Sequence, residues 1–272
     1  MPWLYVFTLF STRQTLHLRL DKDLLCQQFR RAASSYERQA VIQQRTAERL
    51  LDLLAQYSIS QPQRVLEIGC CTGLLTRRLI KRFSSIRELV LNDLVPDFAR
   101  RLDLSALTPT VQLLPGDIET LQLPGSFDLI VSSSTFHWLN DLDCLLDKLS
   151  RSLRPGGLLA FSLYGPENLR EISMLTGIGL RYRSIATIAA SLRQRLRLLH
   201  SSEDVELLHF ACPEDVLRHL RQTGVNALSR SSWTRARLEQ FCTEYRRRFS
   251  VDRGLALSYH PLYLIACREE AK

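Results

Sequence analysis

The chain has 272 residues, of which 45% are hydrophobic and 24% charged, and its formal net charge is +8. This composition is ordinary for a globular protein, and the length suits one large domain. No apolar run reaches about 18 residues, so no membrane span is expected. The seven cysteines form no CxxC pair and the six histidines show no metal-ligand spacing. A disulfide framework and a metal site are therefore not expected, and a reducing cytoplasm fits best.

Strands alternate with helices in the first part of the chain. Residues 37–57 have a helical period, with Ile42, Leu50 and Leu54 on one face. The strands predicted after it are 64–68, 88–92, 110–114, 127–133 and 158–164, and the helices between them are 72–82, one that opens at Pro96, and 141–154. Because several strands are continuous apolar runs, this order predicts an α/β fold with a mostly parallel sheet covered by helices on both faces.

The pattern changes after Tyr164. We predict helical structure over 167–200, a strand at 205–210, helices at 214–224 and 233–248, and one long last strand at 255–268. The expected organisation is a disordered extension or misplaced start at 1–20, a helical lid at 21–58, a Rossmann-like core at 59–166, a helical insertion at 167–204, and a C-terminal part at 205–272 that completes the sheet.

Polar residues gather where the predicted strands end. They lie in the segment 67–73, at Asp93, at Asp117 and in the segment 132–137. Because ligands of open parallel sheets bind outside the carboxyl ends of the strands, this placement predicts a binding site at that edge.

The segment VLEIGCCTGLLT (65–76) reads as a buried strand, a glycine turn and a helix. Gly69 and Gly73 permit positive φ and a close approach of the backbone to a ligand, and the following helix directs its amides at an anion. The GxxxG spacing, with Glu67 two residues before the first glycine, resembles the first motif of class I S-adenosylmethionine (SAM) methyltransferases more than the dinucleotide pattern. Cys71 stands where a middle glycine is usual. If its φ is negative the substitution is nearly neutral, and if positive we expect strain of about 1–3 kcal/mol.

Two further acids fit a bound nucleoside. Asp93 ends the second strand and can accept hydrogen bonds from both ribose hydroxyls. Asp117 follows the third strand, and the resemblance implies that it binds the adenine amino group. The alternatives are a helix N-terminal acid for Asp93 and a turn or cap residue for Asp117. Leu94, Ile118 and Ser132, beside these ends, complete the expected cofactor set.

Longer segments resemble the malonyl-acyl-carrier-protein O-methyltransferases of biotin synthesis, within the class I superfamily. They are FRRAASSYERQA (29–40), FDLIVSSSTFHWL (127–139), LRPGGLLAFSLYGPENLREI (153–172), VLRHLRQTGVNAL (216–228) and LALSYHPLYLIA (255–266). The resemblance runs from about residue 21 to the C-terminus and implies a seven-stranded sheet, SAM as methyl donor, no metal, and methylation of the malonyl carboxylate on an acidic carrier protein. A carboxylate is already ionised at neutral pH, so no catalytic base is expected.

The resemblance also implies substrate contacts. Tyr36 would lie over the cofactor as part of a lid, and His137, beside Trp138, could donate to the malonyl carboxylate with a charge sensitive to pH near 6.5. Arg181 and Tyr182 are further candidates for that carboxylate. For Tyr36 the alternative is helix packing, and for His137 it is a satisfied loop histidine.

The segment 181–199 contains five arginines. On a helix, Arg193 and Arg197 would form an i, i+4 pair beside an apolar stripe, with Arg195 between them. These three side chains either dock an acidic carrier protein or form a solvated helix face. No aromatic-interleaved basic groove supports nucleic-acid binding.

Two other functions stay open at this point. One is a class I methyltransferase acting on a free small acid or a quinone precursor, which would need no docking face. The other is a non-catalytic binding protein on a methyltransferase fold, which Cys71 suggests and which the presence of Glu67, Asp93 and Asp117 argues against.

Overall fold

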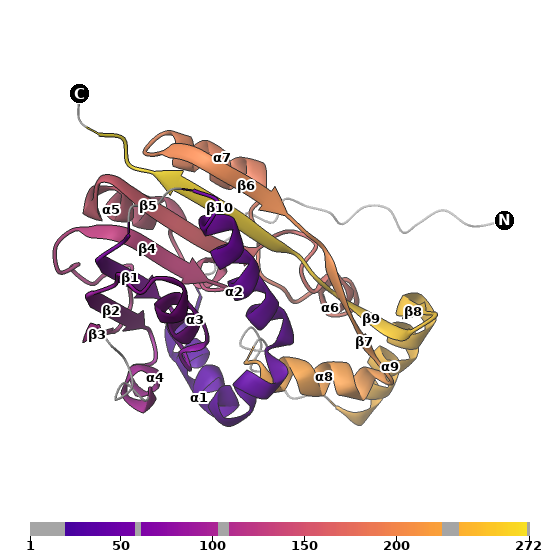
Figure 1. The fold of residues 1–272 in the computed structure, drawn as a ribbon. Helices are drawn as coiled ribbons and strands as arrows, with labels where there is room; N and C mark the ends of the chain where they lie inside the picture. The colour runs from indigo at the N-terminus through magenta and orange to yellow at the C-terminus, as the bar shows by residue number, and fades with distance from the viewer. Residues whose placement is uncertain (1–19, 58–60, 103–108, 225–233, 271–272) are drawn as a thin grey trace.

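The computed structural model describes residues 20–57, 61–102, 109–224 and 234–270 (Figure 1). The expected extension at 1–20 lies outside them except for its last residue, and so do residues 225–228 of the matched segment 216–228. Within the described part, no helix is long and apolar enough to cross a membrane, and no group of side chains could hold a metal ion.

A seven-stranded sheet forms the centre of the molecule, in the order β3-β2-β1-β4-β5-β10-β6. Strands β1 to β5 are parallel, and β10 is antiparallel to both of its neighbours. The mostly parallel seven-stranded sheet is therefore confirmed. Its strands are β1 (Arg64–Ile68), β2 (Glu88–Asp93), β3 (Thr110–Pro115), β4 (Phe127–Ser133), β5 (Leu153–Tyr164), β6 (Arg197–Glu203) and β10 (Pro261–Cys267).

Helices cover both faces of this sheet, as predicted. Residues of α5 (Leu142–Ser152) and α7 (Ile185–Arg193) share one buried apolar cluster with β1, β4 and β5. Residues of α2 (Val41–Leu54) and α3 (Leu74–Arg82) share a second cluster on the opposite face. The other elements near the site are α1 (Lys22–Gln39), α4 (Pro96–Arg101) and the 3-10 helix η1 (Phe136–Trp138).

A second, three-stranded sheet in the order β7-β9-β8 was not expected. It is made of β7 (Glu206–Phe210), β8 (Ser250–Val251) and β9 (Gly254–Tyr259). Helices α6 (Arg170–Thr176), α8 (Pro213–Gln222) and α9 (Arg235–Phe249) pack on it through a third apolar cluster. The predicted single strand at 255–268 is wrong, because the chain leaves one sheet at Tyr259 and enters the other at Pro261.

Two helix predictions also need correction. The helix expected at 37–57 is two helices that meet at Ala40, whose ψ of 45° interrupts the helical backbone. The helix expected to reach residue 200 ends at Arg193, and residues 197–203 form β6, the edge strand beside β10. That edge strand pairs on one side only, and its side chains alternate between exposed and half-buried at both ends.

Candidate functional site

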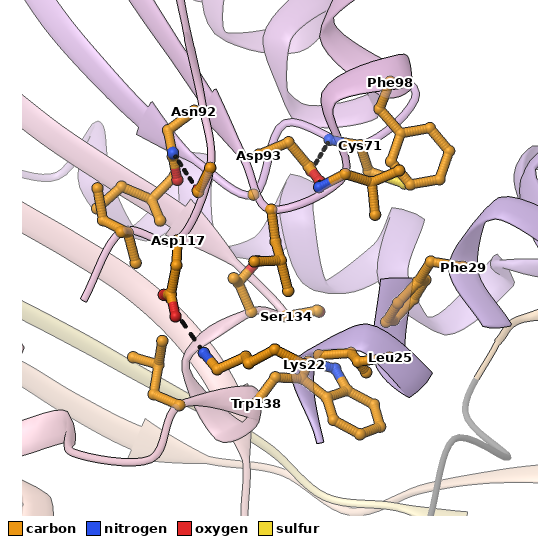
Figure 2. Close-up of a pocket in the computed structure, with 18 of the residues that line it drawn as sticks. Lys22, Leu25, Phe29, Cys71, Asn92, Asp93, Phe98, Asp117, Ser134 and Trp138 are labelled. Carbon is orange, nitrogen blue, oxygen red and sulfur yellow. Dashed lines mark hydrogen bonds and ion pairs between the residues drawn. The ribbon is translucent and has the colours of Figure 1, made fainter. Parts of the chain in front are cut away.

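A cavity lies at the carboxyl ends of the parallel strands, between them and α1 (Figure 2). This is the edge at which the polar residues of the sequence gather. The lining residues come from α1, from the loop after β1, from the ends of β2 and β3, and from the turn after β4. Those used below are Lys22, Leu25, Phe29, Tyr36, Gly69, Cys71, Asp93, Leu94, Asp117, Ile118, Ser134, Thr135 and Trp138.

The turn after β1 requires glycine at both of its predicted positions. Gly69 and Gly73 have φ of 77° and 82°. A Cβ on Gly69 would lie 2.1 Å from Thr135 Oγ1, and one on Gly73 would lie 2.4 Å from Leu102 Cδ2. The turn is thus both left-handed and close-packed, and no other residue fits without movement of its neighbours. Cys71, between them, has a φ of 46°, so the strained alternative holds.

Asp93 joins this turn to the end of β2. Its Oδ2 accepts from the Cys71 backbone N–H at 2.8 Å, and its Oδ1 accepts from the Val95 N–H at 2.7 Å (Figure 2). Burial raises the pKa of Asp93 to about 6, against which these two hydrogen bonds act. The carboxylate lines the cavity and keeps a lone pair on each oxygen, so it can accept from two vicinal hydroxyls.

Asp117 lies at the other side of the cavity, after β3. Its Oδ1 accepts from the Glu119 N–H at 3.0 Å and pairs with Lys22 Nζ at 3.4 Å. Lys22 reaches it from α1 (Figure 2) and also bonds Glu119 Oε2 at 2.6 Å. The second carboxylate oxygen of Asp117 stays available for an amino group in the cavity.

Glu67 is fully buried beneath the turn and does not line the cavity. Neither of its carboxyl oxygens makes a hydrogen bond of good geometry within the described residues; burial raises its pKa to about 8, and the neighbouring hydroxyl and backbone N–H of Thr76 act against this shift. A buried acid so weakly satisfied is unfavourable when ionised and invites a cationic ligand. Gly73 and Ser132 also lie off the cavity wall; the Ser132 hydroxyl donates to the Ile68 carbonyl at 2.8 Å.

A second cavity adjoins the first and contains most of the predicted substrate contacts. Tyr36, His137, Trp138 and Tyr182 all line it, whereas Arg181 is exposed beside it. Phe29, Tyr36, Ser134 and Trp138 line both cavities. Burial lowers the pKa of His137 to about 3, so the predicted charge change near pH 6.5 is wrong: the imidazole is desolvated and stays neutral.

The three arginines predicted to dock a carrier protein lie far from both cavities. Arg197 pairs with Cys267 of β10, which pairs with Leu158 of β5. On β5, Leu158 lies six positions before Tyr164, and Tyr164 lines the second cavity. Six residues of strand span about 20 Å, and this length separates Arg197 from that cavity. The i, i+4 pair of Arg193 and Arg197 does not exist, because only Arg193 is helical.

The residues that α1 contributes were missed by sequence reasoning, apart from Tyr36. Leu25, Phe29 and Tyr36 are spaced by four and seven residues along α1 and face the cavity together. That helical spacing was the available signal. The role of Lys22 could not be predicted from the sequence, because its partners Asp117 and Glu119 are distant in the chain.

Comparison with known proteins agrees with this geometry. The family described as "Methyltransferase domain" matches residues 66–161. The crystal structure of a methyltransferase-like protein from Bacillus halodurans superposes with a TM-score of 0.58, covers 81% of this chain and 98% of its own, and is 16% identical, which shows the fold. The fold and the site together define a class I SAM-dependent methyltransferase.

Two curated relatives narrow the class. The malonyl-[acyl-carrier protein] O-methyltransferase of Chlorobium phaeovibrioides is 42% identical over 92% of this chain and 98% of its own length. The protein of the same name from Bacteroides fragilis is 40% identical over 90% of this chain, which spans only 50% of that relative. The chain belongs to the family of malonyl-[acyl-carrier protein] O-methyltransferases.

Proposed function

We propose that the chain transfers the methyl group of SAM to the free carboxylate of a malonyl group on an acyl carrier protein. The observation that supports this most directly is the pair of adjoining cavities, one with the acids that a nucleoside needs and one walled by hydrogen-bonding aromatic side chains. The family relation supports the choice of acceptor. The product would be a methyl ester whose masked charge suits later chain elongation toward biotin, in the cytoplasm.

In this proposal the chain's residues bind and orient the methyl donor. Asp93 accepts from the ribose hydroxyls and Asp117 from the adenine amino group, between the apolar side chains of Leu94 and Ile118. The turn at Gly69, Cys71 and Gly73 approaches the methionine part, and buried Glu67 offsets its ammonium charge. When bound, SAM supplies an electrophilic methyl on a sulfonium, and α1 covers the cavity as a lid.

Among the described residues, those that line both cavities include no strong base. A carboxylate acceptor needs none, since it carries no proton at neutral pH. The chain's contribution is placement and exclusion of water, which is what Tyr36, Phe29 and Trp138 offer at the junction of the two cavities.

The structure offers two arguments against docking of the carrier protein on Arg193, Arg195 and Arg197. Arg195 already pairs with Asp147 at 3.5 Å, and Arg197 approaches Glu269 at 4.0 Å. Their distance from the second cavity also speaks against a role in delivering the acceptor.

Methyl transfer from labelled SAM to malonyl-carrier protein tests the function, with free malonate and malonyl-CoA as comparison acceptors. We expect ester formation on the carrier-bound malonyl group. Equal turnover of free malonate would favour a methyltransferase of small acids, and failure of the folded protein to bind SAM in calorimetry would favour the non-catalytic alternative. Rescue of a biotin-requiring strain is a second test.

A further inference from the structure

The second cavity holds buried polar atoms that the protein leaves without partners. His137 Nδ1 and Gln43 Oε1 are both buried and have no hydrogen-bond partner among the described residues, and both side chains line this cavity. Gln43 is only 7% exposed. Unpaired buried polar atoms are unfavourable, so two of them facing one cavity indicate a polar ligand there.

The tyrosines around this cavity are oriented by other side chains. Asn168 Nδ2 donates to the Tyr182 hydroxyl at 2.7 Å, which leaves the Tyr182 O–H proton free to donate into the cavity. The Tyr259 hydroxyl is held by His219 Nε2 at 2.8 Å. The cavity wall is therefore a rigid set of neutral hydrogen-bonding groups.

No charged side chain lines this cavity in the described part of the chain. His137, the one histidine among its described lining residues, is neutral because burial lowers its pKa to about 3, and the lining tyrosines stay protonated because burial raises their pKa values. Arg181, the cationic contact predicted from the sequence, is exposed and absent from the lining. A negatively charged acceptor in this cavity would therefore meet only uncharged donors.

We propose that this cavity, the acceptor chamber, holds the carboxylate to be methylated through uncharged donors, the Tyr182 hydroxyl, the His137 N–H and the Gln43 amide, with no cation. This inference rests on the proposed function and adds how its substrate is recognised. A turn of the Gln43 amide presents its NH₂ in place of the orphaned oxygen. The carboxylate would lie next to Ser134 and Tyr36, which border the cofactor cavity.

The absence of a cation suits the reaction. A carboxylate oxygen forms a bond to the methyl carbon while the carbon–sulfur bond breaks, and the bonding pair stays on sulfur, so a neutral ester and a neutral thioether result. No proton moves. Because the opposite charges of the reactants are partly neutralised at the transition state, an arginine on the carboxylate would stabilise the ground state more than the transition state. Neutral donors hold and orient the carboxylate with less of this penalty.

Removing single donors tests the acceptor chamber. We expect Tyr182→Phe and His137→Phe each to lower kcat/KM for malonyl-carrier protein by about 10- to 100-fold, the effect of losing one hydrogen bond to a charged group. The Kd for SAM should stay within about twofold, since neither side chain lines the cofactor cavity. Tyr57→Phe is the matched control, because its hydroxyl donates to the Leu199 carbonyl away from the chamber.

Adding a cation tests the second half of the inference. We expect Gln43→Lys to lower KM for the malonyl acceptor and to lower kcat by about tenfold or more, with Gln43→Met as the uncharged control. If Gln43→Lys does not fold, Tyr182→Phe and His137→Phe alone test the proposal.

Turnover within threefold of wild type in both of these variants would mean that the chamber only holds water. An increased kcat in Gln43→Lys would contradict the inference that the chamber works without a cation. Absence of methylation by the wild-type protein would instead contradict the proposed function.

Discussion

Cys71 lies in a left-handed backbone conformation that glycine adopts without strain. Its φ is 46°, and its backbone N–H donates to Asp93 Oδ2 at 2.8 Å. This hydrogen bond holds the turn against the carboxylate that we expect to bind ribose. A non-glycine residue there costs about 1–2 kcal/mol. The protein therefore tolerates local strain in the wall of its cofactor cavity.

Cys71→Gly should relieve this strain without loss of function. We expect the free energy of unfolding to rise by up to about 1 kcal/mol, because the greater flexibility of glycine in the unfolded chain offsets part of the relief. Activity should stay within about tenfold, or 1.4 kcal/mol. Denaturant titration and methyl-transfer kinetics measure the two effects. A larger change in activity would show that the thiol itself contacts the cofactor.

The raised pKa of Glu67 predicts that the affinity for SAM depends on pH. Its pKa in the free protein is about 8, so the carboxyl is mostly protonated at pH 7 and must lose its proton to pair with an ammonium group. Affinity should rise about 15-fold from pH 6 to 7, with nearly tenfold from Glu67 and about twofold from Asp93, and flatten near 8, where an α-amino group, with a pKa of about 7.8, loses its own charge.

Calorimetry at pH 6, 7 and 8 measures this profile, and buffers of different ionisation enthalpy report the released proton. In Glu67→Gln the rise should shrink to about the twofold that Asp93 contributes through its pKa of about 6. A profile unchanged by this substitution would separate Glu67 from the ammonium site. The same raised pKa makes Glu67 stabilise the free fold below pH 4.5 and lose that contribution as the pH rises through 8.

Among the elements, α1 is tied to the far side of the cofactor cavity at its N-terminal end by the ion-paired side chain of Lys22. Lys22 bonds Glu119 at 2.6 Å, and the two side chains are 20% and 14% exposed. Glu119 also accepts from the backbone N–H groups of Asn140 and Asp141. The pair thus connects α1 to the turns after β3 and η1, on both sides of the cavity.

Lys22→Ala should loosen α1 in the free protein. We expect amide hydrogen exchange in α1 to become about 3- to 30-fold faster, while exchange in β1 and β4 is unchanged. Arg30→Ala is the matched control on the same helix, because Arg30 and its partner Asp97 are 50% and 42% exposed and such pairs contribute little. Equal effects of the two substitutions would show that Lys22 has no special role in holding the helix.

The sequence predicted the parallel half of the fold well, because β1, β2, β4 and most of β5 are buried and read as apolar runs between turn signals, whereas the edge strand β3 is only partly buried. The prediction failed at β6, because the segment RLRLLH (195–200) fits the apolar stripe of a helix as well as the alternation of a strand. Only the pairing with β10 decides between them, and that contact is tertiary. The second sheet was missed for the same reason, since its strands β7 and β9 lie far apart in the chain.

The site could be predicted to a similar extent. Asp93, Asp117 and the Gly69 region could be predicted, because strand ends and a glycine turn are features that a short stretch of sequence reveals. The acceptor chamber could not be assembled, because Gln43 of α2, Asn168 of the turn before α6 and Tyr259 of β9 are far apart in the chain and nothing local in the sequence brings them together. That all the side chains around this cavity are uncharged can be recognised only when the fold has placed them together.

At the scale of the whole molecule, the two ends of the large sheet differ in what they can do. Figure 1 shows α7 and β6 at the top of the view and α1 at the bottom, with the sheet between them. Both cavities belong to the carboxyl ends of the parallel strands, whereas Arg193 lies at the end of α7 near the amino ends. Arg181 is the exposed basic side chain adjacent to Tyr182 of the acceptor chamber.

This asymmetry predicts which face receives an acidic carrier protein. We expect Arg181→Glu to raise KM for malonyl-carrier protein by about 3- to 30-fold at low salt and Arg193→Glu to leave it within twofold, because steering acts where the acceptor must enter. Both arginines are exposed, so the pair is matched in burial. Turnover of a small malonyl thioester without phosphates should be unaffected by either change, which separates docking from chemistry. The reverse order of effects would place the carrier protein on Arg193, Arg195 and Arg197 and require its prosthetic arm to reach the chamber from the far end of the sheet.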